Sequence, residues 1–243
     1  MKPRDLKRPF KWEEREPVIQ DGVFHVPAQF SKYECFTFPE WHDKMLFGNN
    51  LPVKVEYCSG NGAWIAACSL NDPNSNWIAV EKKFERVSKI WSKKKKMVLN
   101  NLITVCGEGY TVTKYYFREE SVSEIFINFP DPWPKTRHAK NRIVQQPFIE
   151  EMWRILQDEG TVTIVTDDEN YSEHIIKEMS YFSGFISQFS APYYKTDLPG
   201  YGTSYFDELW RSKGKQIRYH QFVKKGSLNG CRHPETSRPL CIG

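Results

Sequence analysis

The stretch FINFPDPWPKTRHAKNR occupies residues 126–142, and the rest of the chain is best interpreted outward from it. An apolar run over 125–129 predicts a buried strand that stops at three prolines alternating with Asp131 and Trp133. Because proline restricts its own backbone and that of the preceding residue, Asp131 is kept extended and out of a helix. The cations Lys135, Arg137, Lys140 and Arg142 follow. A carboxylate, an aromatic ring and a basic cluster at one place suit chemistry on a nucleic-acid base.

Strands and helices alternate on both sides of this stretch. Strands are predicted over 53–57, 77–81, 102–106, 124–129, 161–166, 185–189 and 216–223. Helices are predicted over about 63–70, from residue 84, from Pro147, over about 171–182 and over 204–213. Gly160 is expected to end the helix that begins at Pro147. This alternation predicts an α/β fold with a doubly wound sheet and helices on both faces.

Composition and length favour one main domain, expected over 51–225. The chain has 243 residues, of which 40% are hydrophobic. Residues 1–50 are expected to form an N-terminal arm or cap, and residues 226–243 a basic, flexible tail or strap. No apolar run is long enough to span a membrane, and the N-terminus lacks the apolar core of a signal peptide. Six cysteines without CxxC pairing argue against a zinc site and a disulfide framework, so we expect a cytoplasmic protein without a metal.

Positive charge is concentrated towards the C-terminus. Residues 211–243 hold eight Lys or Arg and one acid, a local excess larger than the net charge of +4 for the whole chain. Such a concentration favours a polyanionic partner. Ordinary solubility is the alternative explanation.

An acid lies at or just after the end of each of the first five predicted strands: Glu56, Glu81, Glu108, Asp131 and Asp167. In doubly wound sheets, ligands bind beyond the carboxyl ends of the strands. We therefore expect these side chains to line one shared pocket.

The loop after the first of these strands contains Gly60 and Gly62, and Glu81 follows where such folds place an acid that binds ribose. A dinucleotide fingerprint would need Gly or Ala where Ile65 stands, and no GK[ST] of a P-loop occurs. An adenosine ligand without phosphates, such as S-adenosylmethionine, fits this loop. The alternative is that the glycines only make a tight turn.

At this point the chain resembles a known family. FPDPWPKTRHAKNR at 129–142, continued by IVQQPF at 143–148, is similar to the signature of the tRNA (guanine-N7-)-methyltransferases. The resemblance implies a class I methyltransferase, Rossmann-like fold: a mostly parallel, seven-stranded sheet whose last strand is antiparallel. It also implies S-adenosylmethionine as cofactor and methylation of N7 of a guanosine in the variable loop of tRNA, at tRNA position 46. The partner would be tRNA, with the protein a monomer or a homodimer.

The resemblance further implies roles for individual residues. Those expected to bind the cofactor are Glu56, Gly60, Gly62, Glu81, Glu108 and Asp131. Those expected to bind the substrate are Lys135, Asp167, Thr203, Ser204, Tyr205 and Phe206, with Arg137, Lys140 and Arg142 on the tRNA backbone. Three positions depart from the family pattern: Cys58 replaces a glycine, Glu108 an aspartate, and Phe206 a glutamate.

The chemistry at N7 makes few demands on the protein. N7 carries a lone pair and no proton, so its attack on a sulfonium methyl group needs no general base. Alignment of the two reactants and a carboxylate near the developing cation would suffice. Asp131 is the candidate catalytic residue. Glu81 is expected at the ribose hydroxyls, Glu108 near the adenine amine, and Glu56 near the amino acid end of the cofactor.

Structural roles compete with several of these functional ones. Asp131 could cap a turn, Asp168 could cap a helix beside Asp167, and Ser204 could cap the helix after it. Trp133 could stack on a base or fill the core.

Three other functions remain open at this stage. Asp131-Pro132-Trp133 is similar to the acidic-Pro-aromatic motifs of methyltransferases that act on exocyclic amines, although those motifs usually have two prolines. A tRNA-binding module without catalysis is the second alternative. A nicotinamide oxidoreductase is the third, and Ile65 argues against it.

Overall fold

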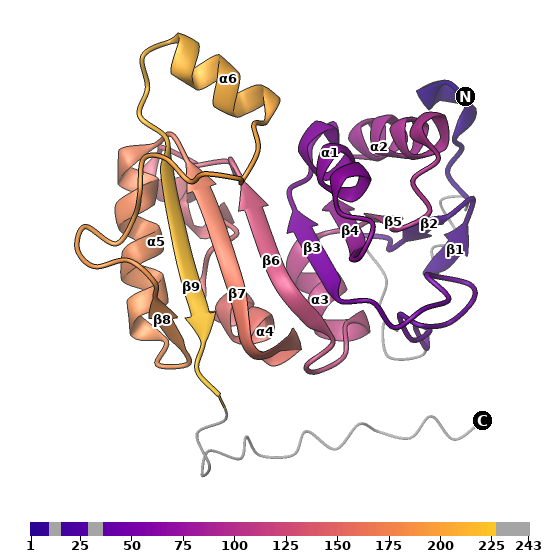
Figure 1. Ribbon diagram of the computed structural model, residues 1–243, viewed down its shortest axis with the longest axis horizontal. Coiled ribbons are helices and arrows are strands. Elements are labelled where there is room, and N and C mark those ends of the chain that lie inside the picture. The colour runs from indigo at the N-terminus through magenta and orange to yellow at the C-terminus, as the bar shows by residue number, and fades with distance from the viewer. Residues whose placement is uncertain (10–15, 29–35, 227–243) are drawn as a thin grey trace.

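A computed structural model describes residues 1–9, 16–28 and 36–226 of the chain. Their strands form one sheet, with helices on both of its faces (Figure 1). The five central strands are parallel to one another: β3 (Val53–Tyr57), β4 (Asn76–Glu81), β5 (Leu102–Cys106), β6 (Val122–Asn128) and β7 (Leu156–Thr166). The predicted α/β, doubly wound class is confirmed.

The strand order reverses in the middle of the sheet. The order is β1-β2-β5-β4-β3-β6-β7-β9-β8, so the chain builds outward from β3 in one direction and from β6 in the other. β9 (Arg218–Lys224) is antiparallel to β7 and to β8 (Phe185–Ser187). The prediction of an antiparallel last strand is therefore confirmed.

The described sheet has nine strands where the sequence predicted seven. The two additional strands, β1 (Val18–Gln20) and β2 (Val23–His25), come from the segment interpreted as an irregular arm. β2 pairs in parallel with β5, and the fully buried Phe24 lies opposite Val105. Strands of three residues are too short to show a periodic pattern, which is why they were missed. The tail over 227–243 lies outside the described residues.

Successive residues of β4 pack on opposite faces of the sheet, as the pleat requires. Ala79 packs on the face covered by α1 (Ala63–Asn71) and α2 (Phe84–Met97), which contribute Ile65 and Ile90. Ile78 packs on the other face, in the core cluster that contains residues of α3 (Gly109–Tyr116), α4 (Gln146–Ile155) and α5 (Glu169–Tyr181). The sheet is therefore buried on both faces.

One expectation about a single element was wrong, and one helix was missed. The sequence analysis did not predict α3, and Gly160 does not end a helix, because α4 ends at Ile155 and β7 starts at Leu156. The pairing of β6 and β7 shifts register between Val122 and Glu124. At Gly160 a Cβ would lie 3.0 Å from the carbonyl oxygen of Ser123, so close backbone approach accounts for this glycine.

The last helix, α6 (Tyr205–Ser212), lies beyond the carboxyl ends of β6 and β7 (Figure 1). Asp207 anchors it: the buried carboxylate accepts hydrogen bonds from Tyr219 Oη (2.6 Å) and from Arg211 Nε (2.7 Å). Within the described ranges, no helix combines the length and the apolar character that crossing a membrane requires.

Candidate active site

The topology brings the strand-end acids to one edge of the sheet. β3 and β6 lie side by side at the point where the strand order reverses, which is where ligands bind in this architecture. Glu56 is the second-to-last residue of β3, and Glu81 is the last residue of β4. Asp131 follows β6, and Asp167 directly follows β7.

Glu56 is buried with one carboxylate oxygen unpaired. Asn128 Nδ2 donates to Oε1 at 2.8 Å, whereas Oε2 has no hydrogen-bond partner among the described residues. The hydroxyl of Ser59 donates to the backbone carbonyl of Glu56. Burial raises the pKa of Glu56 to about 7, partly countered by the Asn128 hydrogen bond. A buried oxygen without a partner is rare in folded proteins and indicates a missing donor, such as a ligand ammonium group.

The loop after β3 runs through the left-handed backbone region three times. The φ angles are +59° at Cys58, +57° at Gly60 and +70° at Gly62. Cys58 therefore occupies a conformation that favours glycine, the residue usual in the family it resembles.

The two glycines have different roles in packing. A Cβ at Gly62 would lie 2.7 Å from Ile90 Cγ1, so this position is set by the contact between α1 and α2. At Gly60 the nearest atom to an added Cβ is the Cys58 carbonyl oxygen at 3.9 Å. Only Gly60 leaves open space for a ligand to approach the backbone.

Glu81 connects this loop to β4. Its carboxylate accepts hydrogen bonds from the backbone N–H of Gly60 (3.0 Å) and of Lys83 (2.9 Å), and only 4% of the residue is exposed. Arg86 Nη1 lies 3.7 Å from Glu81 Oε2. Because a carboxylate has about four acceptor positions, Glu81 can hold ligand hydroxyls while keeping these bonds.

Glu108 has a structural role that the sequence analysis did not consider. Its side chain caps α3 by accepting from the backbone N–H groups of Tyr110 (3.1 Å) and Thr111 (2.8 Å). Its charge nevertheless acts on Cys58 in the loop after β3. Burial first, and then the charges of Glu81, Glu56 and Glu108, raise the pKa of the Cys58 thiol to about 12.

Asp131 is exposed in the loop after β6. Its Oδ1 accepts a hydrogen bond from the backbone N–H of Trp133 at 3.3 Å, so the turn-capping role is present. Among the described residues, none donates a hydrogen bond to the other carboxylate oxygen, which can therefore accept from a ligand. Trp133 is half-buried, with its ring 5.8 Å from that of His138, and it belongs to none of the described core clusters.

The four cations of the basic cluster differ in their surroundings. Lys135, Arg137 and Lys140 are exposed around the 3-10 helix over Thr136–Asn141. Arg142 is half-buried, and its Nε donates to the carbonyl oxygen of Pro132 at 2.9 Å. Arg142 thus differs from the other three cations in its burial and in its hydrogen bond to the backbone.

The predicted caps are confirmed at two places. Asp168 accepts from the N–H of Tyr171 at 2.8 Å at the start of α5, and Ser204 accepts from the N–H of Asp207 at 3.1 Å at the start of α6. Asp167, the neighbouring substrate candidate, forms an ion pair with Lys215.

The segment before and into α6 is largely exposed. Thr203, Tyr205 and Phe206 are exposed, and the hydroxyl of Thr203 lies 3.4 Å from Glu208 Oε1. The ring of Phe206 lies 6.1 Å from that of Phe129, next to the Asp131 loop. The substrate candidates of this segment are therefore beside the end of β6.

Sequence reasoning missed Asn128 and Tyr201, which connect Glu56 on β3 to the segment before α6. Asn128, bonded to Glu56, also accepts from Tyr201 Oη at 2.7 Å. Trp64 Nε1 donates to the Tyr201 carbonyl oxygen at 3.1 Å. The available signal for Asn128 was its place as the one polar residue in the apolar run 125–129.

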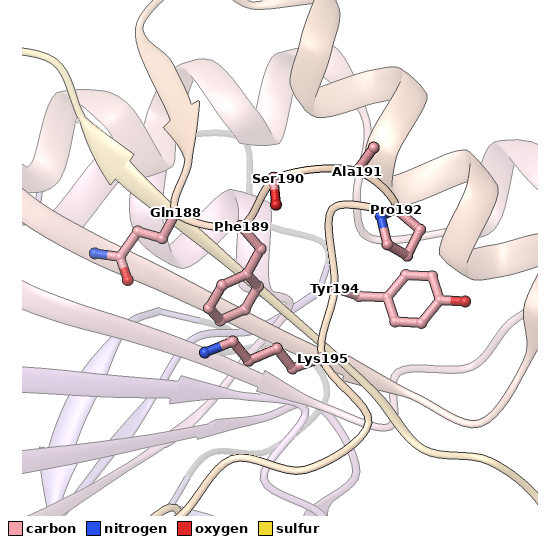
Figure 2. A pocket seen from close by; sticks show the side chains of 7 residues that line it. All are labelled: Gln188, Phe189, Ser190, Ala191, Pro192, Tyr194 and Lys195. Carbon is pink, nitrogen blue, oxygen red and sulfur yellow. The ribbon is translucent and has the colours of Figure 1, made fainter.

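The pocket in Figure 2 lies elsewhere, in the loop after β8. It has a volume of ≈ 540 Å³ and is lined by residues within 188–195, including Phe189, Tyr194 and Lys195. None of the strand-end acids lines it, so we do not assign it to the candidate active site. Across the part of the chain that the structure describes, no group of three or more His, Cys, Asp or Glu could hold a metal.

Comparison with known proteins identifies the family. A family model described as "Putative methyltransferase" matches residues 50–219. The tRNA (guanine-N(7)-)-methyltransferase of Chlamydia caviae is 46% identical over 225 residues, which cover 93% of this chain and 99% of that protein. The chain belongs to the tRNA (guanine-N(7)-)-methyltransferase family. The protein of the same name from Staphylococcus aureus is 31% identical over 178 residues, or 73% of this chain and 80% of that protein.

Solved structures agree on the fold. The 16S rRNA methyltransferase KamB has a TM-score of 0.57 and 14% identity, covering 79% of this chain and 96% of that chain. This likeness supports the architecture alone. The family membership makes the chain a methyltransferase, and its cofactor is S-adenosylmethionine, as the family resemblance implied.

Proposed function

We propose that this protein transfers the methyl group of S-adenosylmethionine to N7 of a guanosine in the variable loop of tRNA. The observation that carries the proposal is the arrangement at the centre of the sheet. Acids at the ends of β3 and β4 and the Asp131 loop after β6 open on the same edge. The family membership gives the reaction and the class of substrate.

The residues at the ends of β3 and β4 fit the cofactor. The unpaired Oε2 of Glu56 would accept from the ammonium group of the methionine part. Glu81 would accept from the ribose hydroxyls, and the open space at Gly60 would admit the adenosine. Glu108 would lie near the adenine amine while it caps α3. Gly62 would act indirectly, by setting the contact between α1 and α2.

The residues after β6 and β7 would bind the tRNA. Lys135, Arg137 and Lys140 are exposed cations suited to phosphates. Asp167 and the segment Thr203–Phe206 would contact the target nucleotide, with Tyr205 and Phe206 offering exposed rings for base stacking. Because the ring of Phe206 lies near Phe129, these rings approach the Asp131 loop.

Asp131 would be the catalytic residue. The cofactor supplies an electrophilic methyl group on a sulfonium. The N7 lone pair would form a bond to this methyl carbon as its bond to sulfur breaks, and the sulfur would leave as a neutral thioether. Positive charge would develop on the purine, and no proton would have to be removed. The exposed carboxylate of Asp131 would stabilise that charge and hold the guanine edge through its N1–H and N2–H donors.

One experiment tests the proposal directly. The protein is incubated with labelled S-adenosylmethionine and unmodified tRNA, which is then treated with borohydride and aniline to cleave at N7-methylguanosine. We expect label in the tRNA and cleavage in the variable loop. Absence of label would reject the proposal that the protein methylates tRNA. Label without cleavage would favour methylation of an exocyclic amine. We also propose a cytoplasmic location, which a tRNA substrate supports.

A further inference from the structure

The loop that carries Asp131 has few backbone donors. Pro130, Pro132 and Pro134 have no N–H group, so backbone hydrogen bonds cannot hold the loop as they hold a strand. The N–H of Phe129 donates to the carbonyl oxygen of Val165 at 2.9 Å, which ties the start of the loop to β7. Beyond this point the loop needs a side chain to fix its position.

The backbone of the loop is also strained. Phe129 and Trp133, on either side of Asp131, have φ angles of +46° and +44°. Non-glycine residues adopt this region only at an energetic cost, and they stay there only when the surrounding contacts hold them. A tether near Asp131 is therefore required for its position to be unique.

Arg142 supplies this tether. Its Nε donates to the carbonyl oxygen of Pro132, the residue after Asp131, at 2.9 Å. Its guanidinium also lies over the ring of Tyr171, with 5.3 Å between Cζ and the ring centroid. Tyr171 is fully buried at the start of α5. A planar guanidinium can stack through its face while it donates through its edge, so one side chain joins the Asp131 loop to α5.

We propose that Arg142 is a positioning residue that holds Asp131 in place for methyl transfer. Its place in the basic cluster suggested a phosphate contact, but its half-buried position and two protein contacts set it apart from the exposed Arg137 and Lys140. Because α5 begins directly after Asp167 and Asp168, Arg142 also links the Asp131 loop to the segment that follows β7. The part that concerns catalysis rests on the proposed function.

The decisive variant is Arg142→Lys, which keeps the charge but loses the planar group. A lysine cannot stack and donate to Pro132 at the same time. We expect kcat on tRNA to fall at least about tenfold, because misplacing a reacting group by about 1 Å can cost about 100-fold. The Kd for tRNA and its salt dependence should stay within about twofold of the wild-type values. Arg118→Lys, at an exposed arginine that precedes β6 and pairs with Glu40, is the matched control and should keep the wild-type kcat.

A phosphate role for Arg142 predicts the reverse pattern. Arg142→Lys would then keep the wild-type kcat, and Arg142→Gln would weaken tRNA binding and lower the salt slope by about one. That result would overturn the proposal.

Limited digestion with trypsin tests the tether without relying on methylation. Lys135, Arg137 and Lys140 are cleavage sites in the tethered segment. We expect cleavage there to be several-fold faster in Arg142→Lys than in the wild-type protein, at equal melting temperature. Unchanged cleavage would reject the tether even if the wild-type protein showed no methyl transfer, so the two proposals fail separately.

A second pair of variants covers the case that Arg142→Lys folds poorly. Tyr171→Phe keeps the ring under the guanidinium. This variant should therefore have the wild-type kcat and the wild-type rate of tryptic cleavage. Tyr171→Leu removes the ring face and should reproduce the effects of Arg142→Lys. If Tyr171→Phe and Tyr171→Leu gave the same kcat and the same rate of tryptic cleavage, the proposal would be contradicted.

Discussion

The two halves of the candidate site are built in opposite ways. At the ends of β3 and β4, Glu56 and Glu81 are 2% and 4% exposed and accept hydrogen bonds from other segments of the chain. After β6, the side chains of Lys135, Arg137 and Lys140 are exposed to solvent. Buried, bonded carboxylates have one geometry, whereas exposed cations have many.

This difference fits two kinds of ligand. A small molecule with a few donors needs acceptors whose positions are set before it binds. A polyanion needs positive charge along its path, and its binding is sensitive to salt. Variants in the two halves should therefore differ in what they change, and the four predictions below test that contrast from the largest effect to the smallest.

The largest effect is expected at the junction of the halves, from Asp131→Asn. Asparagine has nearly the same shape and can still accept from the N–H of Trp133, but it lacks the charge. We expect kcat to fall by about 100-fold to 1,000-fold, the cost typical of removing one group that stabilises transition-state charge. Single-turnover methylation at saturating tRNA measures it. Activity within about tenfold of wild type would show that the carboxylate is not catalytic.

The cofactor half should show a dependence of stability on pH that comes from Glu56. Its carboxyl has a pKa of about 7 in the fold against 4.5 for the free group. The folded protein therefore holds this proton more tightly than the unfolded chain, and stability falls as pH rises from about 5 to about 7. Glu56→Gln removes this contribution.

Urea denaturation near pH 5 and near pH 7.5, without ligand, measures the effect as the difference between wild type and Glu56→Gln. The buried His25 and His220, whose pKa values burial lowers to about 4, push stability the other way, but they cancel in this difference. A difference that does not change with pH would contradict the assignment to Glu56.

The RNA half should respond to salt instead. Lys135→Ala removes one exposed cation, so we expect the Kd for tRNA to rise several-fold and the salt slope to fall by about one. The Kd for S-adenosylmethionine should stay unchanged. Filter binding at several salt concentrations measures the first two, and calorimetry the third. If Lys135→Ala also weakened the binding of S-adenosylmethionine, the two halves of the site would not bind their ligands independently.

The smallest effect is expected from Cys58→Gly in the loop after β3. Glycine relieves the strain of the left-handed conformation at this position, which costs about 1–2 kcal/mol for a non-glycine residue. The substitution also increases the freedom of the unfolded chain and removes a half-buried thiol. We expect a net stabilisation of at most about 1 kcal/mol, measured by thermal unfolding. A loss of more than about 2 kcal/mol would show that the thiol has a packing role that the backbone argument omits.

Local patterns were enough to predict much of this protein. Alternating apolar segments predicted the α/β class and the acids at the strand ends, and the family resemblance implied the antiparallel last strand. The caps at Asp168 and Ser204 were predicted as well, because capping depends on residues close in the chain. The signature over 129–148 pointed to the family to which the chain belongs.

The tertiary structure decided what distant residues do to one another. It placed β1 and β2 on the sheet and joined Arg142 to Pro132 and Tyr171. It also left Glu56 Oε2 without a partner among the described residues. Each of these features depends on the register and packing of segments that are not neighbours in the chain. Periodicity and motifs report which face a residue occupies, but the atom that a side chain meets is set only when the elements pack.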